Sequence, residues 1–230
     1  MFATFDFDVI RRSLGYLFFD GMTFTLMLTG LAGIGGLIFG TLIALMRLSG
    51  FRLLGRIAGL YVDLMRSLPL VLVIFWFYFL VPYIGQWLTG SSRPIRVGAF
   101  TSSLVTFILF EAAYFSEIMR AGIQSISRGQ PAAANALGLT YAQTMRYVVL
   151  PQAFRNMLPV LLTQTIVLFQ DTSLVYVLSI PDFLGAASKV AQRDGRLVEM
   201  YLFAAVVYFA VSSLASFGVR RLQARIAIVR

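Results

Sequence analysis

The chain has 230 residues and contains no cysteine and no histidine, and Lys189 is its one lysine. Without thiols it has no disulfide framework and no thiolate metal site, and without imidazoles it lacks the usual metal ligand and neutral-pH proton shuttle. Lys189 lies between Ser188 and Val190, so it is not part of the Gly-Lys-Ser/Thr core of a phosphate-binding loop. We therefore expect no catalysis, no cofactor, no metal and no ATP hydrolysis from this chain.

Charge is also scarce, because 13% of the residues are charged whereas 59% are hydrophobic, and the mean hydropathy is +0.82. A membrane-spanning helix needs roughly 20 apolar residues. Five stretches approach or exceed that length, namely residues 21–46, 67–82, 97–115, 158–178 and 200–219. They are apolar all round and do not alternate as barrel strands do, so they predict helices. The predicted fold class is all-α integral membrane with five transmembrane helices.

The net charge of +9 comes from arginines that lie mainly at the ends of these stretches. Three clusters follow alternate predicted helices, and the positive-inside rule places them in the cytoplasm. The clusters are Arg47, Arg52 and Arg56; Arg120, Arg128, Arg146 and Arg155; and Arg220, Arg221, Arg225 and Arg230. With five spans, the N-terminus is expected outside and the C-terminus inside. Because this pattern is usual for membrane proteins, we expect lipid and not nucleic acid beside these residues.

Three glycines lie close to one face of the first predicted helix. Gly33, Gly36 and Gly40 fall within about 60° of one another at about 100° per residue. Small residues with this spacing let two membrane helices approach closely. We interpret the stripe as a packing surface and not as a ligand site.

The polar segment between the third and fourth stretches, about residues 121–155, predicts a helix, a turn and a second helix. Pro131 precedes a run of helix formers at a position where helices accept proline. Gly138 can supply the left-handed conformation that ends a helix, and Thr140 can cap the next one. Pro151 is expected to stop that second helix. The alternative is a pair of amphipathic helices resting on the membrane surface.

These residues resemble the EAA loop of permeases from binding-protein-dependent ABC importers. The loop has the pattern Glu-Ala-Ala, three residues, Gly, nine residues and Ile-x-Leu-Pro. Residues 132–134, Gly138 and residues 148–151 keep this spacing, although Ala132 replaces the usual Glu and Val148 replaces Ile. The resemblance implies that this EAA-type loop couples the chain to a separate ATPase subunit. The positions implied in docking are Ala132, Ala133, Ala134, Asn135, Leu137, Gly138, Leu139, Leu150 and Pro151.

Other stretches are similar to the polar amino acid permeases of the same importers. They are residues 66–70 (RSLPL), 110–130 (FEAAYFSEIMRAGIQSISRGQ) and 161–179 (LLTQTIVLFQDTSLVYVLS), and the last two most resemble permeases for glutamate and aspartate. The resemblance implies the type I ABC importer permease fold over residues 21–219, between a short extracytoplasmic segment, 1–20, and a basic cytoplasmic tail, 220–230.

The same resemblance implies a location and a set of partners. The location is the bacterial inner membrane. The partners are a second and different permease subunit, two ATP-binding subunits and an extracytoplasmic binding protein that delivers the amino acid. The transported amino acid is expected to be glutamate or aspartate, with glutamine or a cationic amino acid as the alternative.

Polar residues within the predicted spans are candidates for a substrate pathway, because charge inside a membrane is costly. Glu117 with Arg120, and Asp63 with Arg66, are three residues apart and are expected to pair. A polar stripe on the fourth helix, with Arg66 added, forms the candidate pathway. Its members are Gln164, Gln170, Asp171, Thr172, Ser173 and Arg66. The alternative is that they form polar contacts between two permease subunits.

A self-sufficient secondary transporter is the main competing class of protein. It would normally show an internal repeat and coupling-ion acids at the membrane midplane. The sequence shows no convincing repeat of this kind. We therefore expect an importer subunit and not an independent carrier.

Overall fold

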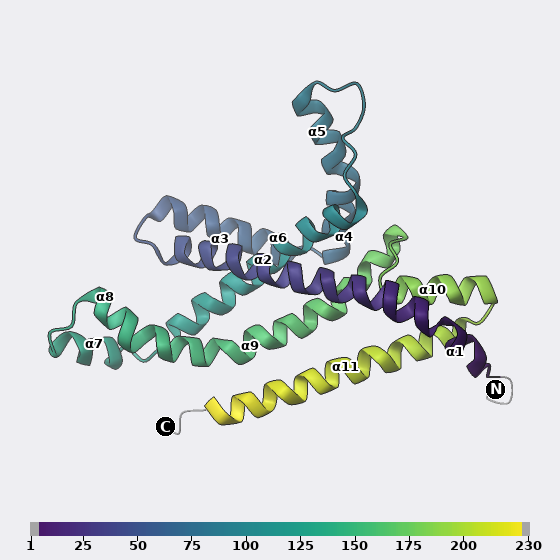
Figure 1. The fold of residues 1–230 in the computed structure, drawn as a ribbon. Helices are drawn as coiled ribbons and strands as arrows, with labels where there is room; N and C mark the ends of the chain where they lie inside the picture. Colours follow the sequence, from purple (N-terminus) through teal and green to yellow (C-terminus); the bar gives the residue numbers. More distant parts are fainter. Residues whose placement is uncertain (1–4, 227–230) are drawn as a thin grey trace. The chain divides into compact units, whose positions relative to one another are not determined.

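The computed structural model describes residues 5–226, which form helices joined by short loops (Figure 1). No strand occurs in this part of the chain. Five helical segments are long and apolar enough to cross a membrane: Phe7–Leu48, Leu70–Thr89, Ala99–Gln124, Tyr141–Leu178 and Leu197–Ile226. The all-helical class and the five spans are therefore confirmed, and each segment is longer than the apolar run that predicted it. Residues 1–4 of the predicted N-terminal segment and 227–230 of the predicted basic tail lie outside the described residues.

The first helical segment begins well before the first apolar run. It consists of α1 (Phe7–Gly15), a π-helical stretch (Tyr16–Met22) and α2 (Thr23–Leu48). Asp6 caps its start, because its carboxylate accepts from the N–H groups of Asp8 and Val9 at 2.9 and 3.3 Å. Residues 7–20 are thus helical and continuous with α2.

The remaining helices are named as follows. They are α3 (Arg52–Ser67), α4 (Leu70–Phe75), α5 (Val81–Thr89), α6 (Ala99–Gln124), α7 (Gly129–Ala136), α8 (Tyr141–Thr144), α9 (Leu150–Asp171), α10 (Phe183–Asp194) and α11 (Leu197–Ile226). The chain folds as two compact units. The first contains residues up to Ile34, Leu68–Ile108 and Ile166–Ala215, and the second contains Gly35–Ser67, Leu109–Thr165 and the residues from Ser216 onward.

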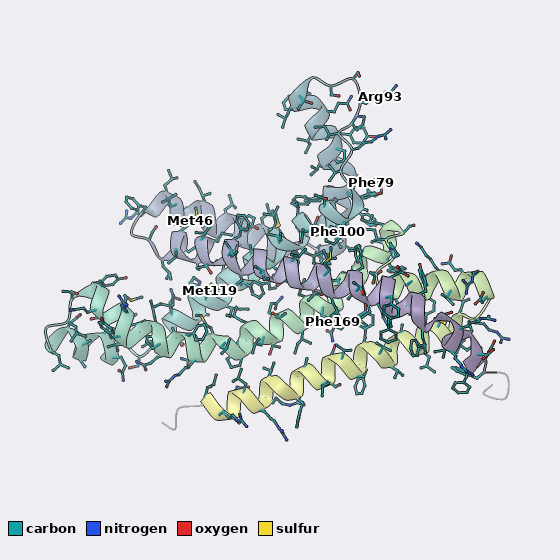
Figure 2. The ribbon with its side chains drawn as sticks, in the orientation of Figure 1. Met46, Phe79, Arg93, Phe100, Met119 and Phe169 are labelled. Atoms are coloured by element: carbon teal, nitrogen blue, oxygen red, sulfur yellow. The ribbon has the colours of Figure 1, made fainter. Side chains whose placement is uncertain are left out.

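The core of the first unit forms around α10, which packs beside the π-helical stretch of the first segment (Figure 1). Close approach is possible because Gly21 has no side chain: a Cβ there would lie 2.9 Å from the Cβ of Ala186. Phe183 at the start of α10 is fully buried, and its backbone N–H donates to the hydroxyl of Thr25 at 3.0 Å. Phe169 of α9 joins the same core (Figure 2).

The loop before α10 buries a carboxyl group outside the predicted spans. Asp182 is fully buried and accepts from the backbone N–H groups of Leu184 and Gly185 at 3.0 and 2.9 Å. Burial raises the pKa of the Asp182 carboxyl to about 7, although these two hydrogen bonds act in the opposite direction.

Asp182→Asn is expected to remove a pH dependence of stability. The folded pKa is raised, so the contribution of Asp182 is fully present below about pH 4 and is lost as the pH rises through about 7. Asparagine caps helices about as well as aspartate but does not titrate. Circular-dichroism melts in detergent across this range should show the wild-type melting temperature falling relative to the variant as pH rises. Parallel pH profiles for the two proteins would contradict the assignment.

The second unit is built on close contact between α2 and α6. A Cβ at Gly36 would lie 2.8 Å from the Cβ of Glu111, and one at Gly40 would lie 2.9 Å from the Cβ of Phe115. Phe115 and Met119 of α6, of which Met119 is labelled in Figure 2, form a core with Ala44 and Leu161. The predicted packing role is therefore confirmed for Gly36 and Gly40. In the first unit, a Cβ at Gly33 would make only ordinary contact with Leu168.

Candidate functional site

The predicted helix-turn-helix lies in the second unit and spans α7, α8 and the start of α9. Helix α7 ends at Ala136, and Gly138 follows with a φ of +80°. The N–H of Gly138 donates to Asn135 O at 2.9 Å, and the N–H of Leu139 donates to Ala134 O at 3.1 Å. These two bonds define a Schellman motif, which satisfies carbonyls that the helix end leaves free. The predicted left-handed turn at Gly138 is confirmed.

The second helix of the segment is capped as the sequence predicts. The hydroxyl of Thr140 accepts from the N–H of Gln143 at 3.3 Å, while the Gln143 side chain accepts from the N–H of Thr140 at 2.9 Å. This capping box fixes the direction of α8 immediately after the glycine turn. A bond of 3.4 Å between the side chains of Thr144 and Asn135 joins α8 to α7. The turn is therefore held on both sides by hydrogen bonds.

The prediction that Pro151 stops this helix is wrong. The chain passes from α8 through a π-helical turn, Met145–Val149, into α9, and Pro151 is the second residue of α9. A proline ring normally clashes with the carbonyl four residues earlier, and the wider π turn relieves that crowding. The Gln152 side chain donates to Val148 O at 2.7 Å and so satisfies a carbonyl of the turn. The helix thus continues from Tyr141 into the fourth span.

The segment presents apolar and small side chains at its surface. Leu137 is 81% exposed at the tip of the turn, and Tyr141 is 79% exposed beside it. Ala134 is buried and Leu139 is half-buried, so these two predicted docking residues support the turn. The other predicted docking residues are exposed: Ala132, Ala133, Asn135, Leu137, Gly138, Leu150 and Pro151. A large exposed leucine among small residues suits contact with a partner's groove.

An ion-pair network connects α2 and α6 in the second unit. The Glu117 carboxylate accepts from Arg120, as the spacing predicts, and also from Arg47 of α2. All three side chains are less than 30% exposed. The sequence gives no signal for Arg47, because it lies 70 positions from Glu117. The network holds two arginines on one carboxylate.

Glu117→Gln is expected to destabilise the second unit by about 1–3 kcal/mol, because two partly buried guanidinium groups lose their charged acceptor. Thermal unfolding in detergent measures the effect. Arg155→Gln is the matched control, since Arg155 is exposed on α9 and the substitution also changes one charge. Equal melting temperatures for the two variants would show that the network contributes nothing to stability.

The predicted pathway residues have separate partners. Gln164 donates to both carboxylate oxygens of Glu111, at 3.3 and 3.2 Å, within the second unit. In the first unit, Gln170 donates to the hydroxyl of Ser212 at 2.9 Å, and the buried hydroxyl of Thr172 donates to Phe169 O at 2.7 Å. These hydrogen bonds give Gln164, Gln170 and Thr172 a structural role, in addition to the role in a substrate pathway that the sequence predicts.

The helix type also changes at this point. Helix α9 ends at Asp171, which is half-buried, and residues Thr172–Leu178 form a 3₁₀ helix. Spacing at 3.6 residues per turn therefore does not describe Thr172 and Ser173. The prediction of one polar stripe assumed a single α-helix and did not include this change of helix type.

Two further polar residues differ from expectation. The Arg66 guanidinium lies over the ring of Tyr114, 5.4 Å from its centre, rather than in the predicted pair with Asp63. Glu111 is fully buried and is not among the predicted pathway residues. A carboxylate inside an apolar run is a sequence signal that could have identified it.

Among residues 5–226, no group of three or more His, Cys, Asp or Glu side chains is placed to hold a metal ion.

Comparisons with known proteins give consistent results. The family described as "binding-protein-dependent transport system inner membrane component" matches residues 36–228. The glutamate/aspartate import permease protein GltK of Escherichia coli O157:H7 is 53% identical over 225 residues, which cover 97% of this chain and 99% of that protein. The glutamine transport system permease protein GlnP of Escherichia coli strain K12 is 32% identical over 225 residues, covering 98% and 99%.

Solved structures share the fold. A chain of an amino acid ABC transporter crystallised with histidines superposes with a TM-score of 0.86 at 32% identity, covering 96% of this chain and 99% of that one. The inward-facing methionine ABC transporter MetNI gives a TM-score of 0.74 at 19% identity, covering 93% and 97%. The fold is that of these transporter membrane subunits.

Proposed function

Since the chain belongs to the family of binding-protein-dependent transport system inner membrane components, we propose that it is the permease subunit through which an ATP-driven importer moves glutamate or aspartate. Members of this family are transport subunits and not enzymes, and separate ATPase subunits hydrolyse ATP. The observation that supports glutamate or aspartate as the substrate is the 53% identity to a glutamate/aspartate import permease over nearly the whole chain. Identity to the glutamine permease over the same length is 32%.

We assign the docking of an ATPase subunit to the turn between α7 and α8. Its rigidity supports this role, because the Schellman motif and the capping box fix the backbone on both sides of Gly138. The exposed Leu137 supplies an apolar contact at the tip. Ala132 replaces the acidic residue usual at this position, so docking rests on shape and apolar contact and not on a salt bridge there.

The topology that we propose follows from the arginine clusters. The docking turn, the connection from α2 to α3 and the end of α11 all lie in basic segments, so we place them in the cytoplasm and the start of α1 outside. In this orientation a binding protein delivers substrate to the α10 side of the chain. A second permease subunit completes the pore.

Asp171 is proposed to meet the substrate's ammonium group. A carboxylate within a membrane span would repel the side chain of glutamate but attract its amino group. Within the same unit, Gln170 and Ser173 supply donors to a carboxylate of the substrate. Thr172 supports the helix end, since it is buried and bonded to Phe169 O.

Reconstitution of the chain with its genomic neighbours in liposomes tests the proposed function. We expect ATP-dependent uptake of labelled glutamate that excess aspartate suppresses and excess glutamine or arginine does not. Omitting each component in turn identifies the partners, and uptake that disappears without a second permease establishes a pore of two different chains. Uptake of glutamine in place of glutamate would leave the family assignment intact and overturn the substrate.

A further inference from the structure

The second unit contains an open pocket of about 440 Å³ where α2 ends and α3 begins. Four arginines line it: Arg47, Arg52, Arg56 and Arg120. Glu117 offsets one of their charges, because it pairs with Arg47 and Arg120. The pocket therefore keeps an excess of positive charge, and Arg52 and Arg56 lie four residues apart on α3, where like charges repel each other. An anion in the pocket would remove this repulsion.

Because glycine has no side chain, two glycines leave the main chain that lines the pocket accessible. Gly50 and Gly59 line it, and a Cβ at either position would meet nothing within 4 Å. Packing therefore does not require glycine at Gly59, where it is less favourable for the helix than alanine. The pocket also includes the start of α3, whose first turn has no acidic residue to balance its free N–H groups. These features leave room for a bulky anionic group against the helix.

The surroundings of the pocket are apolar and lie at the membrane surface. The first candidate span ends at Leu48, so the pocket lies at an end of a membrane helix in either orientation of the chain. Phe51, which lines the pocket, is 73% exposed, and Leu53, Ile57 and Leu60 are exposed along α3. Such a helix, with a basic face and an apolar face, is typical of a membrane interface.

We propose that this pocket binds the phosphate headgroup of an anionic phospholipid, with the acyl chains along Leu53, Ile57 and Leu60. Guanidinium groups bind phosphate through paired N–H donors, and basic pockets between membrane helices bind anionic headgroups. The apolar residues next to the pocket select a lipid over a free anion. This inference does not depend on which amino acid is transported.

The test measures the thermal stability of the purified full chain in neutral detergent. Short-chain phosphatidylglycerol is the probe, and short-chain phosphatidylcholine and inorganic phosphate are the comparison ligands. Arg52→Gln with Arg56→Gln removes two pocket charges while keeping the Arg47–Glu117–Arg120 network. Arg220→Gln with Arg221→Gln removes the same charge from α11, outside the residues that line the pocket.

Phosphatidylglycerol should raise the melting temperature of the wild type and of the α11 variant, and the other two ligands should not. The affinity of the pocket variant should fall about thirtyfold, which is about five- to sixfold for each arginine. An equal response in all three proteins, or no response in the wild type, would overturn the proposal. A response to inorganic phosphate equal to that of phosphatidylglycerol would instead assign the pocket to a free anion.

Discussion

Gly138→Val is expected to reduce ATP-driven uptake by at least about tenfold while the chain still folds and inserts. Gly138 has a φ of +80°, a conformation that a β-branched residue resists at a cost of about 1–3 kcal/mol. Relief of this strain would break the hydrogen bonds to Asn135 O and Ala134 O and so displace Leu137 from the tip of the turn. The measurement is labelled glutamate uptake in liposomes, together with ATP hydrolysis by the assembled transporter.

Two variants separate the docking role from backbone strain. Gly90 also has a positive φ, +65°, with nothing within 4 Å of an added Cβ, and it lies in the first unit. Gly90→Val therefore introduces similar strain far along the chain from the docking turn and should retain most of the uptake. Gly138→Asn should recover part of the lost uptake, since asparagine tolerates the left-handed region. Normal uptake by Gly138→Val would refute the docking role of the turn.

Gly40→Leu should prevent the second unit from packing and lower its stability by about 3 kcal/mol or more. An added Cβ would lie 2.9 Å from the Cβ of Phe115 and 3.0 Å from Ala112 O. Both are held by the backbone of α6 and have no flexible end that could move aside, so α2 and α6 must separate. The yield of monodisperse protein in detergent and its melting temperature measure this loss.

Gly30→Leu is the control for this substitution. Gly30 lies on the same helix α2, and a Cβ there would meet nothing within 4 Å. The control adds the same side chain at an exposed position and should melt close to the wild type. If the two variants have equal stability, close packing of α2 against α6 does not hold the unit together.

Features with a local physical cause could be predicted from the sequence. The five spans follow from the length of apolar runs, the turn at Gly138 follows from glycine's tolerance of positive φ, and the Glu117–Arg120 pair follows from helical spacing. Each depends on residues within a few positions of one another. Such patterns are readable without knowledge of the tertiary fold.

Features that depend on contacts between distant segments could not be predicted. Arg47 reaches Glu117, and Gln164 reaches Glu111 53 positions away, only after helices pack. The π-helical turn before Pro151 has no 3.6-residue signature, so the proline appeared to end a helix that in fact continues. The candidate substrate pathway was affected most, because polar residues in a membrane helix show that partners are needed but not which ones.

The wide turn at Met145–Val149 also bears on how chains of this kind can diverge in length. A π-helical turn holds one residue more than an α-helical turn, so it is equivalent to a single inserted codon within a helix. Removing that residue would return a regular α-helical turn, and the segment before it would keep nearly the same orientation relative to α9. The turn at Gly138 can therefore face the same way whether or not the extra residue is present, and a relative that lacks the residue would not need a different partner surface. Under the docking role that we propose for the turn, a one-residue change of length at Met145–Val149 is one that the fit to an ATPase subunit would tolerate.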